Sequence, residues 1–229
     1  MRPASPLTHR RPRRDAAAVR RSAVAVLTLG TLLDDPDGRA RIVAFLESLA
    51  APAQLDVGVY VLRTARRFGA PVTFEAGPRS LRRGLPRDVR CTEVRAWLLE
   101  PEWLVAGMGL AWVRGPTAAR PAALVGLGAR PCGTVAASLG RVLGVPAAVL
   151  VRDRDAPITA EKDRRWLRWS TLFGADSERV ADQLARRGVA AAFEPGPGPE
   201  AIYSRLGQRF AECLVQGRGQ GAERVTSSA

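Results

Sequence analysis

The sequence has one histidine, three cysteines and no long apolar run, and each shortage excludes a class of function. The single histidine, His9, stands near the amino terminus, so no Ser/His/Asp or Cys/His catalytic group is expected. The cysteines Cys91, Cys132 and Cys213 are far apart and form no Cys-x-x-Cys pair. This spacing argues against a zinc site or a disulfide framework, so we predict no bound metal and a reducing compartment.

No segment has the length of a membrane span or the form of a signal peptide. The most apolar run, 103–113, covers eleven residues, well short of the roughly 20 that cross a bilayer. The short apolar stretch at 16–19 is interrupted by Arg20 and Arg21, which breaks the core of a signal peptide. We therefore expect a cytoplasmic protein, with peripheral contact to a membrane left open.

Lysine is almost missing, with Lys162 alone, yet arginine is abundant and the formal net charge is +13. The first 21 residues supply +6 of that charge, and the remainder supplies +7. A basic chain attracts anionic lipid, nucleic acid or phosphorylated ligands over long range, but this concerns encounter and not reaction. A bias of the genome toward GC-rich codons would also enrich arginine.

The most informative stretch predicts a strand, a helix and a second strand. Residues 122–127 and 147–151 are nearly continuous apolar runs, as expected of parallel strands buried on both faces. A helix is expected at 134–143, with Gly144 at its carboxyl-terminal cap. A parallel sheet binds ligands at the carboxyl ends of its strands. The loops at 126–133 and 152–157 are therefore the places to seek a site.

Similar patterns along the chain predict an α/β fold: a Rossmann-like, doubly wound, mostly parallel sheet in a three-layer αβα sandwich. We expect a strand at 22–29, a turn-rich loop at 32–38 and a helix at 39–49. Further strands are expected at 56–62, 71–75, 89–97, 172–175 and 189–193, and further helices at 101–114, 159–170 and 178–187. As domains we expect a disordered basic arm (1–21), one α/β domain (22–200), a closing helix (201–216) and a flexible tail (217–229).

The order and spacing of four stretches resemble the amino-terminal, acceptor-side domain of GT-B glycosyltransferases, particularly the family-4-like ones. Residues 24–49 are similar to that family's first strand, glycine loop and helix, and 120–153 to its "P-D-V-V … G-V-P-V-V-x-x-x-H-D" unit. Residues 169–188 are similar to its "A-D-x-V-I-A-x-S" helix, and Phe193-Glu-Pro to the start of its interdomain crossover. The resemblance covers roughly residues 22–200.

The resemblance implies half of an active site. The family's first loop commonly reads Gly-Gly-x-x, and only Gly38 is retained here, while the histidines that usually follow two of its strands are absent. The donor-binding half, with its paired glutamates and nucleotide pocket, has no counterpart in the sequence. Because glycosyl transfer occurs between the two domains, the resemblance implies a partner subunit that binds the nucleotide sugar. A lipid-linked or small-molecule acceptor is implied for this half.

The candidate site residues follow the predicted strands. After the first strand, backbone amides and a guanidinium would lie near an anion, supplied by Gly30, Thr31, Gly38 and Arg39. The other interpretation of these residues is a strand-to-helix turn. Gly126 and Arg130 belong to a glycine-containing loop that lacks the Gly-x-Gly-x-x-Gly spacing of a dinucleotide site, so no cofactor is predicted.

At the end of the strand 147–151, Asp153 is the best-placed catalytic base, with Arg152 and Ser177 as binding residues. The other interpretation of these three residues is a surface ion-pair cluster and a helix cap.

Two other functions stay open. A non-enzymatic α/β binding protein would dock on an anionic membrane, or less readily on nucleic acid, through its basic arm. Binding by the arm would weaken steeply with salt and disappear on deletion of residues 1–21, whereas a sugar pocket would survive both changes. The third function is that of a small Rossmann-like enzyme with an untypical nucleotide loop.

Overall fold

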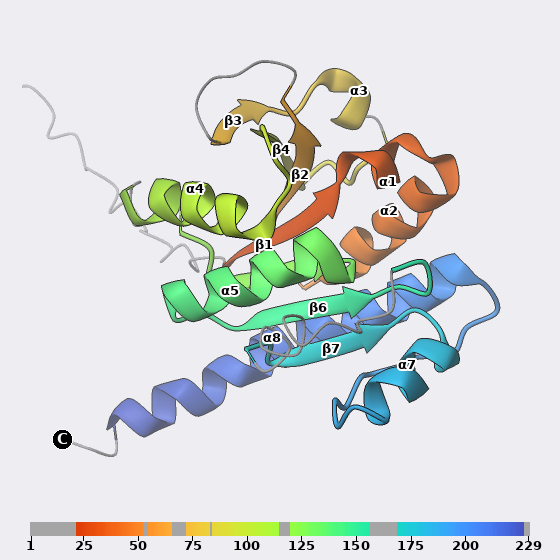
Figure 1. Cartoon of the computed structure of the whole chain (residues 1–229). Helices are drawn as coiled ribbons and strands as arrows, with labels where there is room; N and C mark the ends of the chain where they lie inside the picture. The colour runs from red at the N-terminus through yellow and green to blue at the C-terminus, as the bar shows by residue number, and fades with distance from the viewer. Residues whose placement is uncertain are drawn as a thin grey trace, which may run out of the picture.

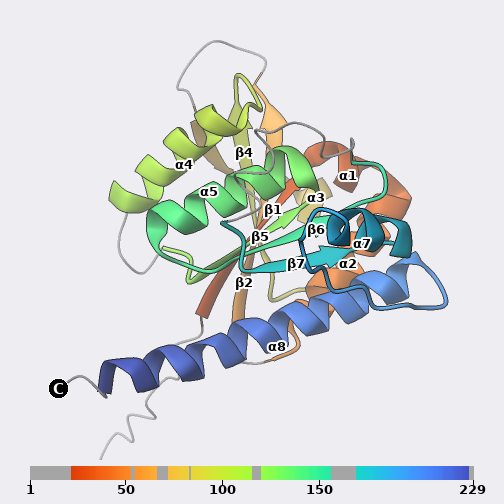
Figure 2. The same cartoon turned by 60° about the horizontal axis from the view of Figure 1, so that its bottom comes forward.

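Two five-residue strands in the middle of the chain are buried at every position. These strands, β5 (Ala123–Leu127) and β6 (Ala147–Val151), consist of small and aliphatic residues, which suits a parallel sheet covered on both faces. A computed structural model describes residues 22–52, 55–65, 72–82, 84–114, 120–155 and 169–226. It places both strands inside one sheet, which has seven strands in the described part of the chain. Figure 1 labels β6 in this sheet, and Figure 2 labels both strands.

The strand order in the sheet is β3-β4-β2-β1-β5-β6-β7. All neighbouring pairs are parallel except β3 and β4, which are antiparallel. The chain runs outward from β1 first on the β2 side and then on the β5 side. The other strands are β1 (Ser22–Leu29), β2 (Leu55–Thr64), β3 (Val72–Ala76), β4 (Arg90–Ala96) and β7 (Leu172–Ala175).

Helices cover both faces of this sheet, as Figure 2 shows. Val24 and Val26 of β1 pack in the same buried cluster as α2 (Pro36–Ala50) and α8 (Pro199–Thr226). Ala25 and Leu27 pack with α4 (Pro101–Arg114) and α5 (Thr134–Leu143) on the other face. The predicted α/β, Rossmann-like, doubly wound, three-layer single domain is confirmed. The shorter helices are α1 (Gly30–Asp34), α3 (Arg79–Arg82) and α7 (Glu178–Ala185).

The structure corrects the prediction of a turn-rich loop at 32–38. This stretch is helical, because α1 follows β1 directly and α2 begins at Pro36 after the single residue Asp35. The side chain of Asp35 accepts a hydrogen bond from Gly38 N at 2.9 Å, and proline suits the first helical position. These are helix-start signals, which the prediction had assigned to a turn.

Other boundaries also differ from the prediction. No strand extends over 189–193 in the described structure, where Ala192 makes an isolated bridge to Gly174. The closing helix α8 continues to Thr226 rather than ending at 216. A π-helical turn at Ala129–Gly133 precedes α5. The basic arm 1–21 and most of the helix predicted at 159–170 lie outside the described residues.

The sheet order positions a site at one edge. Strands β1 and β5 are neighbours, and the helices that follow them, α2 and α5, pack on opposite faces of the sheet. Such a switch in strand order opens a crevice outside the carboxyl ends, where open α/β sheets bind ligands. Within the described residues, no helix is both long and apolar enough to cross a membrane, and no group of acidic, histidine or cysteine side chains is arranged to hold a metal ion.

Candidate functional site

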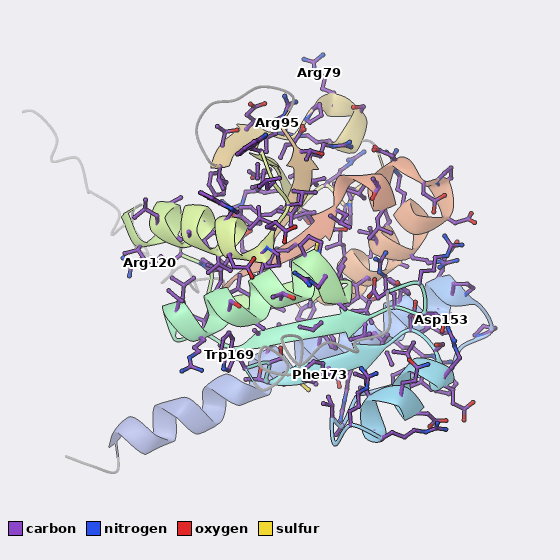
Figure 3. The ribbon with its side chains drawn as sticks, viewed as in Figure 1. Arg79, Arg95, Arg120, Asp153, Trp169 and Phe173 are labelled. Carbon is purple, nitrogen blue, oxygen red and sulfur yellow. The ribbon has the colours of Figure 1, made fainter. Side chains whose placement is uncertain are left out.

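A cleft of about 970 Å³ lies at the carboxyl ends of β1, β2 and β4, with β3 along its side. Three charged residues line this cleft: Arg63 of β2, and Glu93 and Arg95 of β4. Their chain neighbours Leu62 and Val94 pack toward α4 on the other face of the sheet. Because side chains alternate along a strand, these charged residues share one face. Figure 3 shows Arg95 beside β3 and β4.

Five charged side chains form a connected network along this cleft, which we call the cleft network: Asp34, Arg63, Glu93, Arg95 and Glu75. Arg63 donates two hydrogen bonds to the carboxylate of Asp34, at 2.9 and 2.7 Å. Its Nε also lies 3.7 Å from Oε1 of Glu93. Arg95 Nε lies 3.0 Å from the same oxygen and 3.5 Å from Glu75 Oε2. Charges alternate in sign from α1 across the sheet to β3.

Glu93 is the buried centre of the cleft network. The residue is only 3% exposed, and a carboxylate is rarely buried unless it is paired. Its partners Arg63 and Arg95 keep 30% and 46% of their side chains exposed. The two guanidinium groups therefore reach the cleft while the carboxylate fixes them from below. Such a group is preorganised to meet a polar ligand without moving first.

Gly30 makes room for Arg63. A Cβ atom at position 30 would lie 2.7 Å from Cγ of Arg63, closer than real side chains approach, so the glycine lets the arginine cross the start of α1. The hydrogen bond from Arg63 in turn holds the pKa of Asp34 below its usual value. The glycine directly after β1 thus determines where the guanidinium of Arg63 lies.

A much smaller pocket of about 30 Å³ lies on the other side of the α1–α2 corner. Its lining includes Gly38, Arg152, Asp176 and Tyr203. Beside it, Oδ2 of Asp155 accepts hydrogen bonds from the backbone N–H groups of Ala129 and Arg152, at 2.7 and 2.8 Å. Oδ1 of Asp155 accepts from the Arg152 guanidinium at 3.1 and 2.7 Å. One carboxylate therefore joins the loops that follow β5 and β6.

Burial raises the pKa of Asp176 from 3.8 to about 6, and the nearby charges of Asp153 and Asp155 act in the same direction. A raised folded-state pKa means that protonation favours folding, so this carboxyl costs stability as pH rises from about 4 to about 6. We expect Asp176→Asn to be more stable than the parent chain at pH 7 by about 1–2 kcal/mol, allowing for partial solvent exposure. Urea unfolding across this pH range measures the difference.

The low-pH end of this series is a control. Asparagine at position 176 keeps the side-chain oxygen that accepts a hydrogen bond from Asp153 N. At about pH 4 the two chains should therefore be nearly equal in stability. A stability difference that stays the same at every pH would contradict the raised pKa.

Five of the predicted site residues line the larger cleft or the smaller pocket. Gly30, Thr31 and Arg39 line the larger cleft, and Arg39 Nε donates to Leu33 O at 2.8 Å. Gly38 and Arg152 line the smaller pocket. A Cβ at Gly38 would lie 2.5 Å from Leu32 O, so this glycine also allows α1 to pack closely on α2.

The remaining predicted residues lie outside both pockets. Gly126 is buried in β5, and a Cβ there would lie 2.6 Å from Cys132 O, which gives it a packing role. Arg130 lies 3.8 Å from Glu100. Asp153, beyond the end of β6 (Figure 3), is paired with Arg179 at 2.6 Å. Ser177 caps α7 by accepting from Val180 N at 3.3 Å and donates to Asp153 at 3.2 Å.

These contacts match the surface ion-pair and helix-cap interpretation of Asp153 and Ser177, and the catalytic assignment of Asp153 stays a prediction. The thiol of Cys132, which lies before α5, is also not suited to catalysis. Cys132 is fully buried in the π-helical turn, and burial raises the pKa of its thiol to about 12. A thiol that is protonated at neutral pH is a poor nucleophile.

The three residues at the centre of the cleft network, Arg63, Glu93 and Arg95, are not among the predicted site residues. A usable signal exists, because each stands in the carboxyl-terminal half of a predicted strand or just after it. Carboxyl ends of parallel strands meet at one edge, so charged residues there are candidates for a common site. The signal was hidden because alternation of charged and apolar residues is also ordinary for a half-exposed strand.

No protein-family model and no curated protein matches the sequence. Solved structures with similar backbones include a UDP-N-acetylglucosamine 2-epimerase at 10% identity, with a TM-score of 0.49 over 75% of this chain and 46% of that one. The enzyme from Neisseria meningitidis bound to UDP-GlcNAc has 10% identity and a TM-score of 0.47, over 75% and 46%. The enzyme from Methanocaldococcus jannaschii has 11% identity and a TM-score of 0.43, over 73% and 43%.

The chain thus spans less than half the length of these structures. At such scores the similarity carries no argument about function, and the fold assignment rests on the sheet order and the helix layers described above.

Proposed function

We propose that this chain is the acceptor-side half of a GT-B-type glycosyltransferase and that the larger cleft binds a hydroxyl-rich acceptor, such as a sugar. The observation that carries the proposal is the cleft network, with a buried carboxylate that holds two guanidinium groups toward the cleft. A sugar hydroxyl both donates and accepts hydrogen bonds, so it is satisfied by carboxylates and arginines placed side by side.

The charge balance of the cleft favours such a neutral ligand over a phosphate. Arg39, Arg63 and Arg95 are matched by Asp34, Glu75 and Glu93 among its lining residues. The cleft is also lined by four residues with hydroxyl groups: Thr31, Thr64, Thr73 and Ser80. A phosphate site would instead present an excess of donors and positive charge.

The proposal assigns the nucleotide-sugar donor to a partner chain or domain. The described residues form one sheet, and glycosyl transfer needs contacts to donor and acceptor together in the transition state. By itself, the chain is expected to bind acceptor without transferring a sugar. A relative that binds and has lost catalysis would behave in the same way until the partner is supplied.

Ligand-observed NMR with the purified chain tests this function. A panel of neutral mono- and disaccharides, inorganic phosphate and nucleotide sugars is compared at equal concentration. Saturation transfer to at least one neutral saccharide, with none to inorganic phosphate, is the expected result. Unaided transfer from a nucleotide sugar would contradict the half-site, and binding of phosphate with no saccharide would contradict the cleft assignment.

A further inference from the structure

Five large apolar side chains are exposed on α4 and the turn before it: Trp97, Leu98, Trp103, Leu110 and Val113. We call this surface the α4 patch. Each of these residues is between 40% and 53% exposed. Single exposed apolar residues are ordinary, but five of them on one helix and the turn before it, two of them tryptophans, mark a surface that contacts something apolar.

The outward face of α4 carries no charge over three turns. From Trp103 to Val113 the helix contains no charged residue, while Leu104, Met108 and Trp112 are buried against the sheet. Trp103, Leu110 and Val113 are spaced at seven and three residues, which places them on one side of a helix. A helix that is apolar all round normally lies in an interior, and here half of it faces outward.

Positive charge borders the carboxyl-terminal end of the α4 patch. Arg120 donates hydrogen bonds to the carbonyl oxygens of Trp112 and Val113 at the carboxyl end of α4 (Figure 3). These partners are neutral, so the contact leaves the charge of Arg120 uncancelled. At the other end, Arg130 is paired with Glu100 at 3.8 Å, just before α4 begins, so these two charges balance. The whole chain carries a formal net charge of +13.

We propose that the α4 patch docks this chain on an anionic lipid surface. The patch is the outer side of a helix and not a groove, and tryptophan with aliphatic residues bordered by arginine is the composition of surfaces that lie at the membrane interface. Lipid headgroups of negative charge complement Arg120 and the net positive charge of the chain. A groove or pocket would instead have favoured an inserted protein side chain.

The patch reaches the rim of the larger cleft. Trp97 and Leu98 directly precede Leu99, which lines the cleft. Docking through α4 would therefore hold the cleft beside the lipid headgroups. Resting on the proposed function, this placement indicates an acceptor attached to a lipid rather than a free sugar.

Vesicle sedimentation with the full chain tests the docking surface. Phosphatidylcholine vesicles with and without phosphatidylglycerol are compared at low and high salt, because binding by the basic arm is screened by salt while apolar insertion is not. We expect the parent chain to bind phosphatidylglycerol vesicles and to keep part of that binding at high salt. Trp103→Glu combined with Leu110→Glu should reduce the affinity by about tenfold or more.

The control for each single substitution, Trp103→Glu or Leu110→Glu, is Gln183→Glu, which adds the same single negative charge at an exposed position of α7 and should bind vesicles like the parent. Circular dichroism and urea unfolding verify that each variant is folded, and single substitutions replace the double variant if it is not. Equal binding by the patch variants and the parent would overturn the proposal. So would a self-association that the patch substitutions abolish in a chain that does not bind vesicles.

Failure of this proposal is distinguishable from failure of the proposed function. Glu93→Gln alters the cleft and leaves the α4 patch unchanged, so it should weaken saccharide binding and preserve vesicle binding. The patch variants should bind vesicles less well and should keep the affinity of the parent chain for a soluble saccharide.

Discussion

Asp155→Ala should destabilise the fold by about 3–5 kcal/mol, the cost of removing one partner from a buried ion pair. Both side chains of the pair are largely buried, with Asp155 6% and Arg152 14% exposed. The substitution leaves the Arg152 guanidinium without its carboxylate and two backbone N–H groups without their acceptor. Because one of those groups is Ala129 N, the π-helical turn before α5 loses its hydrogen bond to the loop that follows β6.

Urea unfolding monitored by circular dichroism measures this loss, and Asp153→Ala supplies a control from the same loop. Asp153 also pairs with an arginine, Arg179, but the two side chains are 46% and 64% exposed. An exposed ion pair contributes at most about 1 kcal/mol. Equal losses for the two substitutions would mean that Asp155 does not hold the loops together.

The elements that sequence predicted well are those whose environment is uniform along their length. Strands β5 and β6 are buried on both faces, so every residue is apolar and the pattern has one interpretation. Helix α5 is equally clear, since Gly144 ends it in a left-handed conformation with φ of 68°. Together these elements gave the fold class and the edge of the sheet where ligands bind.

Prediction failed where one residue serves two purposes. Asp35 and Pro36 are common in turns and also at helix starts, and only the packing of α1 against α2 decides between them. The cleft network could not be predicted for a different reason. Arg63 and Glu93 are thirty residues apart, and their meeting depends on β2 pairing with β4 rather than with β3, as the register shows. Local spacing contains no information about that choice.

Glu93→Gln should weaken saccharide binding in the cleft by about tenfold to a hundredfold, the range of a lost charge-assisted hydrogen bond. Glutamine cannot neutralise Arg63 and Arg95, so the two guanidinium groups lose the shared oxygen that fixes them. The cleft also changes from balanced charge to a net positive charge. We therefore expect inorganic phosphate, which the parent chain does not favour, to bind the variant more tightly.

The matched control for this exchange is Glu75→Gln, which changes the charge by the same amount at the outer end of the cleft network. Glu75 is 50% exposed and lies 3.5 Å from Arg95, so water replaces its contacts at little cost. If saccharide affinity fell equally in both variants, net charge alone would govern the cleft. A selective loss at Glu93, accompanied by a gain in phosphate binding, would instead show that the buried carboxylate selects neutral, hydroxyl-rich ligands by holding the arginines in place.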